Sequence, residues 1–217
     1  YRRDKKLKIK HNYLSEQFSD KKIILKKISK IVKNNDFTLG EEVNRFENNF
    51  KNLIKSKYCI AVGSGTDAIY LSLKALGIKP GDEVITTAFT FYATIGAIVQ
   101  SGAKPVFVDI QFEDHNIDPN KIEKAITKKT KAIMIVHWSG RPCELDKIKK
   151  ICRRYKLKLI QDSCHAIDAK FRGKSIVSYG DICTYSMHPL KNLNIWGDGG
   201  FMLTQNKEIA KKIQLLR

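Results

Sequence analysis

The chain has 217 residues, of which 42% are hydrophobic, so it has enough apolar material for a large domain and is not globally disordered. Its 40 lysines and arginines outnumber its 22 aspartates and glutamates and give a formal net charge of +18. No apolar run approaches the ~20 residues of a membrane helix and no signal peptide is visible, so we expect no membrane partner.

Such an excess of basic residues is typical of proteins that bind a polyanion such as nucleic acid. The basic residues, however, stand in scattered pairs beside apolar residues at helical spacing, for example Lys21-Lys22, Lys128-Lys129 and Lys149-Lys150. We therefore interpret the charge as a compositional bias of helix surfaces and expect no nucleic-acid partner. A basic regulatory or nucleic-acid-binding module on the same fold stays open as an alternative.

The cysteines and histidines are dispersed along the chain. The five cysteines include no CxxC pair and no zinc-finger spacing, and an odd, irregular set favours reduced thiols in a cytoplasmic protein. The five histidines are equally scattered, so we expect no metal site.

The first part of the chain contains a charged arm and two predicted helices. Residues 1–10 lack a periodic pattern, and we expect them to form a flexible basic arm. Apolar residues recur at helical spacing over residues 21–32 and again over residues 41–54.

Beyond residue 54 short apolar runs alternate with helical patterns. The runs cover residues 82–88, 104–110, 131–137, 157–162, 181–186 and 200–204. They are continuously apolar, as expected of strands that are buried on both faces. The helical patterns cover residues 66–76, 92–100, 119–126 and 145–155. This alternation predicts an α/β domain with a mostly parallel sheet and helices on both faces.

The last stretch, "KEIAKKIQLLR", has the pattern of a helix that has just begun. No closing cap or tail follows it, so we expect the protein to continue past residue 217.

One candidate binding element is "VGSGTDAIYLSLKAL", where Gly63-Ser64-Gly65 precede a predicted helix. A helix N-terminus offers unpaired N–H groups to a phosphate, and glycines permit a close approach. Ser64 or Thr66 could add a hydroxyl, and Asp67 fits beside a phosphate only if its carboxylate turns away and its N–H points in. An ordinary strand-to-helix turn capped by Thr66 would explain the same pattern.

A second candidate is "LKLIQDSCHA", in which Asp162 ends a predicted buried strand and His165 follows. A desolvated carboxylate needs a cationic or N–H partner, and a protonated heterocyclic nitrogen would serve. The alternatives are a helix cap or structural ion pair for Asp162, and a satisfied core or loop histidine for His165.

Two further stretches carry Lys191, Ser186 and Phe91. In "YSMHPLKNLNIWGDGG", Ser186 ends a strand pattern, and Lys191 lies in a glycine-containing loop where desolvation would favour the nucleophilic amine. In "TTAFTFYAT", the aromatic residues Phe89, Phe91 and Tyr92 follow a strand, and one of them could stack on a flat ligand. A solvated loop lysine and a core aromatic are the plainer interpretations.

Together these signals describe one ligand, pyridoxal 5′-phosphate (PLP). They comprise a phosphate-binding turn, a carboxylate for a ring nitrogen, an aromatic for a ring face and a lysine for a Schiff base. Each follows a predicted strand, so the same edge of the sheet could gather all of them.

The stretches "SGTDAIYLSLKALGIKPGDEVITTAFTFYAT", "PVFVDI", "QDSCHAIDAKFRGK" and "GDICTYSMHPLKNLNIWGDGGFMLT" resemble the DegT/StrS family of fold-type I PLP enzymes. The resemblance covers about residues 11–217 and implies a PLP-binding large domain with N-terminal helices. The family's smaller C-terminal domain is missing from this stretch of chain.

The resemblance also implies a role for each candidate. Lys191 matches the catalytic lysine that binds PLP covalently and moves a proton, and Asp162 matches the catalytic carboxylate that pairs with the pyridine nitrogen. Phe91 and His165 match residues on the two faces of the ring. The phosphate ligands implied are Gly65, Thr66, Asp67 and Ser186.

By the same resemblance we expect transamination of a nucleotide-linked keto-sugar, with glutamate as the donor, by a homodimer. The loop "HWSGRPCELDKI" departs from the family's usual residues and could tune the sugar pocket. A sugar dehydratase or an inactive homologue stays open. Dehydratases of the family carry histidine in place of the lysine, and Lys191 occupies the position of the lysine here.

Overall fold

The computed structural model describes residues 9–217, so most of the predicted basic arm of residues 1–10 lies outside the described residues. The chain divides into two compact units, with the boundary between Glu42 and Val43. The predicted division into an arm and one domain from residue 11 stays a prediction.

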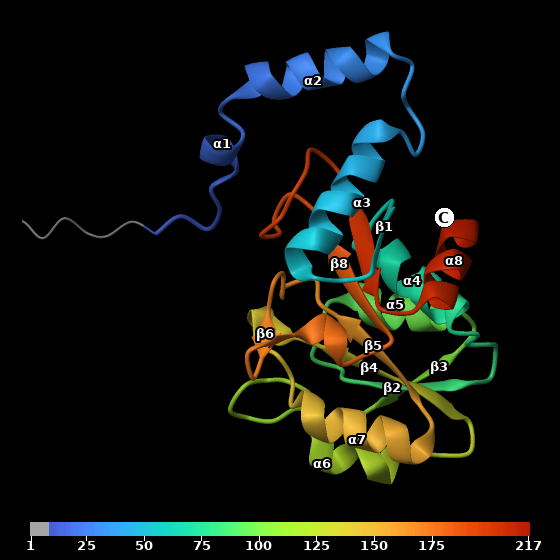
Figure 1. Cartoon of the computed structure of the whole chain (residues 1–217). Coiled ribbons are helices and arrows are strands. Elements are labelled where there is room, and N and C mark those ends of the chain that lie inside the picture. The colour runs from blue at the N-terminus through green and yellow to red at the C-terminus, as the bar shows by residue number, and fades with distance from the viewer. Residues whose placement is uncertain (1–8) are drawn as a thin grey trace, which may run out of the picture. The chain divides into compact units, whose positions relative to one another are not determined.

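The described part of the first unit is helical (Figure 1). It contains the short helix α1 (Leu14–Gln17) and α2 (Lys21–Lys33), which is one residue longer than the predicted helix. No residue of α2 is buried, and its lysines alternate with exposed aliphatic side chains such as Ile23 and Ile28.

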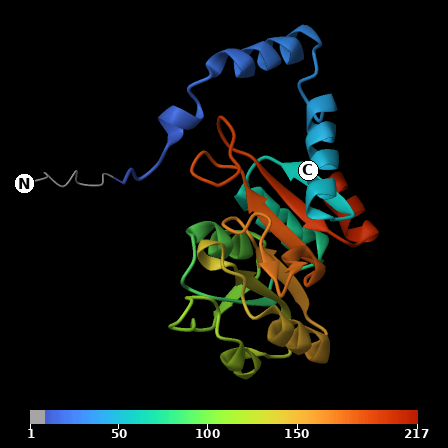
Figure 2. The ribbon, with the colours of Figure 1, turned by 60° about the vertical axis from the view of Figure 1, so that its left-hand side comes forward.

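The second unit is built on a seven-stranded sheet (Figures 1 and 2). Its strands are β1 (Tyr58–Val62), β2 (Glu83–Thr86), β3 (Lys104–Phe107), β4 (Thr130–Val136), β5 (Lys158–Asp162), β8 (Ile182–Ser186) and β9 (Gly200–Thr204). Their order is β1-β9-β8-β5-β4-β2-β3. Strand β9 pairs antiparallel with both neighbours, and the other pairings are parallel, which confirms the predicted mostly parallel sheet.

Helices cover both faces of this sheet, as predicted. The helices of one face are α3 (Glu41–Ile54), α6 (Pro119–Ile122) and α7 (Leu145–Tyr155), and those of the other are α4 (Gly65–Ala75), α5 (Tyr92–Gln100) and α8 (Lys207–Leu216). In β4, Ile133 and Ile135 join the core under α7, whereas Ala132 and Met134 join the core under α4 and α5. Burial on both faces explains why such strands read as continuous apolar runs.

Besides the short helix α1, which was not predicted, the structure differs from the predicted elements in three further places. The predicted helix 119–126 is divided into α6 and a 3₁₀ turn, η1 (Glu123–Ala125). Strand β3 lies at the sheet edge and is only partly buried. A hairpin of β6 (Lys170–Phe171) and β7 (Lys174–Ser175) was not predicted, because strands of two residues carry no periodic signal.

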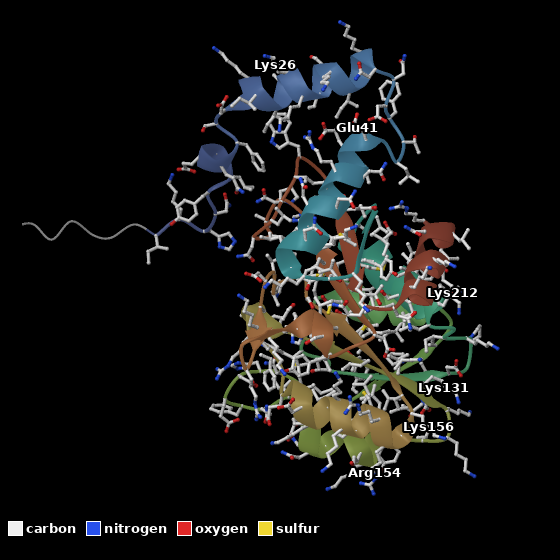
Figure 3. The ribbon with its side chains drawn as sticks, in the orientation of Figure 1. Lys26, Glu41, Lys131, Arg154, Lys156 and Lys212 are labelled. Carbon is white, nitrogen blue, oxygen red and sulfur yellow. The ribbon has the colours of Figure 1, made fainter. Side chains whose placement is uncertain are left out.

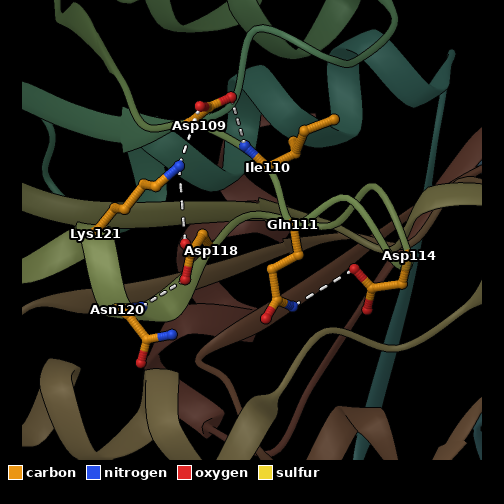
Figure 4. Close-up of polar contacts among 7 residues, drawn as sticks. All are labelled: Asp109, Ile110, Gln111, Asp114, Asp118, Asn120 and Lys121. Carbon is orange, nitrogen blue, oxygen red and sulfur yellow. Dashed lines mark hydrogen bonds and ion pairs between the residues drawn. The ribbon is translucent and has the colours of Figure 1, made fainter.

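The loop between β3 and α6 is held by its own polar contacts (Figure 4). Lys121 Nζ donates to Asp109 at 3.1 Å, and this hydrogen bond lowers the pKa of the Asp109 carboxyl. Asp118 caps α6 by accepting from the Asn120 N–H. The contacts fix the loop that leads to Asn116, which supports the site described below.

The basic residues labelled on the second unit point away from the ribbon (Figure 3). Lys131 lies on β4, Arg154 on α7 and Lys212 on α8, and all three side chains are exposed. Their distribution over separate elements agrees with a compositional bias of the surface. Among residues 9–217, no helix is long and apolar enough to span a membrane.

Candidate active site

The carboxyl ends of β1, β4, β5 and β8 border a cavity of about 430 Å³. Ligands bind at this edge in open α/β sheets, because the loops that leave the strands diverge there. The cavity collects seven of the eight predicted site residues: Gly65, Thr66, Phe91, Asp162, His165, Ser186 and Lys191.

The N-terminus of α4 forms one wall of the cavity. Ser64 is the N-cap, and its Oγ accepts from the Asp67 N–H at 3.0 Å. A Cβ on Gly65 would lie 2.7 Å from Ser186 Cβ, and a Cβ on Gly200 would lie 2.3 Å from the Ser64 carbonyl oxygen. Only glycine permits these approaches, which bring the start of α4 against the end of β8 and the start of β9.

Asp67 does not line the cavity. Its side chain is exposed, and its carboxylate accepts from Ser64 Oγ at 2.9 Å on the side of Gly63. The condition set by the sequence, a carboxylate turned away from the anion, is therefore met. Its N–H is already used by the cap, however, so a phosphate-binding role for Asp67 stays a prediction. The cap itself is Ser64 and not Thr66.

Asp162 ends β5 and is only 6% exposed. Its Oδ2 accepts from Thr94 Oγ1 at 2.7 Å, and its Oδ1 accepts from the Cys164 N–H at 3.2 Å. Hydrogen bonds to a charged acceptor are among the stronger ones in proteins and offset the desolvation of this carboxylate. The predicted need for N–H or cationic partners is thus partly met within the protein.

His165 and Phe91 both line the cavity. Desolvation and the charge of Lys191 lower the pKa of His165, while Asp162 opposes this shift. The His165 ring lies 5.7 Å from the ring of Trp138, edge to face. Phe91 is exposed and lies 4.4 Å from the ring of Tyr92. Their neutral rings suit the two faces of a flat ligand.

Lys191 lies in the loop between β8 and β9 and is half-buried. Its N–H donates to the His188 carbonyl at 2.8 Å, and its carbonyl accepts from Asn194 Nδ2 at 3.1 Å. Asn194 also binds the Pro189 carbonyl at 2.8 Å. The loop backbone is fixed on both sides of the lysine, which holds the amine at the cavity wall.

Sequence reasoning assigned no role to several residues of the site. Thr94 lies one helical turn after Phe91, and a threonine in a helix gives no signal of its own. Trp138, in η2 (Trp138–Gly140), lies in the loop "HWSGRPCELDKI", and the sequence predicted no contact for its side chain. Its N–H donates to Asn116 Oδ1 at 3.0 Å, so the loop after β3 positions it.

A buried polar network lies directly behind the site. His137 Nδ1 accepts from the Cys143 N–H at 3.1 Å, so the proton is on Nε2, which donates to Gln161 Oε1 at 3.0 Å. Burial lowers the pKa of His137 to about 4, although Gln161 and Asp162 oppose the shift. The imidazole is therefore neutral and joins the ends of β4 and β5.

The cysteines and the potential metal ligands of the described residues form no second site. All five cysteines are free thiols, and burial raises the pKa of Cys164, which lines the cavity. Within the described part of the chain, no group of three or more His, Cys, Asp or Glu side chains could hold a metal ion.

The fold and the cavity together define a large α/β domain that can bind a flat, phosphorylated ligand at the carboxyl edge of its sheet. Residues 19–217 match the model of the DegT/DnrJ/EryC1/StrS aminotransferase family. The chain therefore belongs to this family, and the predicted family and fold class are confirmed.

Individual relatives agree with this assignment. A pleiotropic regulatory protein of Geobacillus stearothermophilus is 44% identical over 94% of this chain and 55% of its own length. A 3-oxo-glucose-6-phosphate:glutamate aminotransferase of Bacillus subtilis is 43% identical over 87% of this chain and 42% of its own. Relatives from Aneurinibacillus thermoaerophilus and Streptomyces venezuelae are transaminases named for dTDP-linked amino sugars.

Among solved structures, NtdA of Bacillus subtilis with bound cofactor PMP superposes with a TM-score of 0.87 at 38% identity. The match covers 95% of this chain and 47% of that one. The chain thus spans about half the length of the relatives it matches.

Proposed function

We propose that this protein is a PLP-dependent sugar aminotransferase. The observation that carries the proposal is the convergence of Lys191, Asp162, Phe91 and the start of α4 on one cavity from four separate segments. Any one of them has a plainer explanation, but a lysine, a buried carboxylate, an aromatic ring and a helix N-terminus match the groups of one cofactor.

The residues fit PLP on the protein's own geometry. Gly65 and Thr66 leave free N–H groups at the start of α4 for a phosphate, and Ser186 is packed against Gly65. Asp162 lines the cavity, and its carboxylate could accept a further hydrogen bond from a protonated ring nitrogen. Phe91 and His165 would cover the ring, and Lys191 would hold the aldehyde end through Nζ.

When bound, PLP supplies an electron-accepting ring for the carbon that carries the amino group. The protein supplies the rest. Asp162 would hold a proton at the ring nitrogen, because its carboxylate is fixed at the end of β5. Lys191 Nζ would move a proton during the transfer. The aromatic residues around the ring exclude water and orient it.

For the substrate we propose a nucleotide-linked keto-sugar, with glutamate as amino donor. This rests on relatives named for dTDP-linked amino sugars and on one named as a glutamate aminotransferase. We expect a cytoplasmic homodimer, in keeping with the resemblance of the sequence. Lys191, at the position where dehydratases carry histidine, favours transamination over dehydration.

The test uses the complete protein reconstituted with PLP. Borohydride reduction followed by mass spectrometry of peptides should find the cofactor fixed on Lys191. The Lys191→Ala variant should lose this label and about 10²–10⁴-fold of amino transfer to keto-sugars, measured as release of 2-oxoglutarate from glutamate. The exposed Lys131→Ala variant serves as the control and should keep both properties.

A label that persists in Lys191→Ala would contradict the proposal. So would the absence of 2-oxoglutarate with every keto-sugar offered, whether linked to a nucleotide or to a phosphate. If the enzyme aminated only keto-sugar phosphates, the proposed aminotransferase activity would stand and only the proposed nucleotide-linked substrate would be wrong.

A further inference from the structure

We propose that Thr94 is a positioning residue for the cofactor's ring nitrogen, acting through Asp162 as the end of a hydrogen-bond relay from Thr90. The proposal rests on the proposed function. It concerns a side chain that is completely buried on α5 and that does not itself line the cavity.

The direction of each hydrogen bond in the relay follows from chemistry. An ionised carboxylate only accepts, so Thr94 Oγ1 must donate to Asp162 Oδ2 across 2.7 Å. A hydroxyl has one proton, which Thr94 thereby uses. Thr90 Oγ1, at 2.8 Å from Thr94 Oγ1, must then be the donor of that pair. The relay runs in one direction, from Thr90 through Thr94 to Asp162.

The relay fixes the rotation of the carboxylate. Thr94 holds Oδ2 from α5, and the Cys164 N–H holds Oδ1 from the loop after β5. Because α5 and the loop after β5 each hold one oxygen, the carboxylate plane cannot turn freely. The remaining lone pairs of Asp162 therefore keep a fixed direction. Without Thr94, one oxygen would be left buried without that donor, and the carboxylate would reorient towards any other donor.

The relay also connects the segment of the ring-face aromatic with the carboxylate for the ring nitrogen. Thr90 lies immediately before Phe91, and the Thr94 N–H donates to the Phe91 carbonyl at 3.2 Å. The segment that carries the ring-face aromatic is therefore tied to the carboxylate that meets the ring nitrogen. One helical turn would therefore position both the ring-face aromatic and the carboxylate for the ring nitrogen.

The chain offers a matched control for the substitution. Thr86, on β2, is also fully buried, but its Oγ1 has no hydrogen-bond partner among the described residues. Thr94→Val and Thr86→Val remove the same hydroxyl from the same kind of environment, and only the first breaks the relay. Thr94→Ser keeps the hydroxyl and removes a methyl group.

The experiment measures the affinity of the complete apoprotein for PLP and for its analogue in which C–H replaces the ring nitrogen. Thr94→Val should weaken PLP binding about tenfold, because it removes one hydrogen bond to a charged group. Thr94→Ser and Thr86→Val should stay within about threefold of the wild type. The analogue, which has no ring nitrogen for Asp162, should bind Thr94→Val and wild type about equally.

Equal PLP affinity of Thr94→Val and wild type would overturn the proposal. An equal loss for PLP and for the analogue would overturn it too, because it would indicate a structural effect on the whole pocket. Should wild type bind neither compound, the proposed function would fail together with this inference. Wild-type binding of PLP with no effect of Thr94 would overturn only the inference.

Discussion

The two ends of strand β5 hold their charges in opposite ways. At the amino end, Lys158 is half exposed and lies 3.8 Å from Asp181, whose side chain also accepts from the Leu159 N–H. At the carboxyl end, Asp162 is buried and held by Thr94 and by the Cys164 N–H. Water stabilises the first charge, and fixed donors stabilise the second.

The contrast holds against the exposed ion pairs of the amino edge, although buried polar residues such as Glu83 and Thr130 also stand at the amino ends of their strands. The carboxyl edge carries buried polar groups such as His137 and Ser186, together with glycines pressed against other backbone. The amino edge carries exposed ion pairs such as Lys158–Asp181. Since buried polar groups depend on fixed partners, changes at the carboxyl edge should cost much more than changes at the exposed ion pairs of the amino edge.

The largest effect on stability should come from His137 at low pH. Its folded-state pKa of about 4 lies below the ordinary value of 6.5, so the unfolded chain binds a proton first as the pH falls. Above pH 6.5 His137 is neutral in both states, so its full contribution to the free energy of unfolding is present. As the pH falls from 6.5 towards 4, the free energy of unfolding should decrease by about 3 kcal/mol in total. Urea unfolding at a series of pH values measures it.

Other groups titrate in the same range, so the comparison is with His137→Gln, which cannot take up the proton. This variant should be less stable at pH 7 because it loses the bond from Cys143. Its stability should nevertheless fall less steeply between pH 6.5 and 4. Parallel curves for the two proteins would contradict a neutral, buried His137.

The next effect should come from Gly200→Ala. The new Cβ would stand 2.3 Å from the Ser64 carbonyl oxygen, and backbone at that point can move only by separating α4 from β9. We expect a loss of about 1–3 kcal/mol in the free energy of unfolding, with weaker PLP binding. Thermal and urea unfolding measure the first, and a cofactor titration the second.

Gly96→Ala provides the matched control. Gly96 is exposed on α5 and a Cβ there would meet nothing within 4 Å, so the variant should be unchanged or stabilised by about 0.5–1 kcal/mol. If Gly200→Ala behaved like Gly96→Ala, the close approach of β9 and α4 would not be needed for the fold.

The smallest effect should come from the amino edge. Lys158→Ala removes one partner of a half-exposed ion pair and should cost less than about 1 kcal/mol, decreasing further at high salt. Urea unfolding at low and high ionic strength tests this. A loss of several kcal/mol would show that the two edges of the sheet do not differ as described.

Much of the fold could be predicted because each signal is local. The apolar residues of α7 recur at helical spacing, and those of β4 form a continuous run, so both elements were predicted to within a residue or two. The hairpin of β6 and β7 could not be predicted, since four paired residues show no pattern and depend on the packing around them.

The site residues likewise include some that the sequence could predict and some that it could not. Lys191, Asp162 and Phe91 could be proposed because each follows a strand and has a side chain with chemistry of its own. Thr94 and Trp138 could not, because their roles consist of contacts with residues far away in the sequence. Thr94 and Asp162 are separated by 68 residues and meet only when α5 packs beside β5.

By itself, the sequence determined the alternation of strands and helices, the family and the kinds of group available at the sheet's carboxyl edge, because short-range periodicity and motif spacing encode them. Only the tertiary structure decided that Ser64 caps α4, that Asp67 turns away from the cavity and that Thr94 holds Asp162. Hydrogen bonds need particular distances and directions. Those of Ser64 and Asp67 depend on the local backbone conformation at the start of α4, and that of Thr94 arises only when segments 68 residues apart pack together.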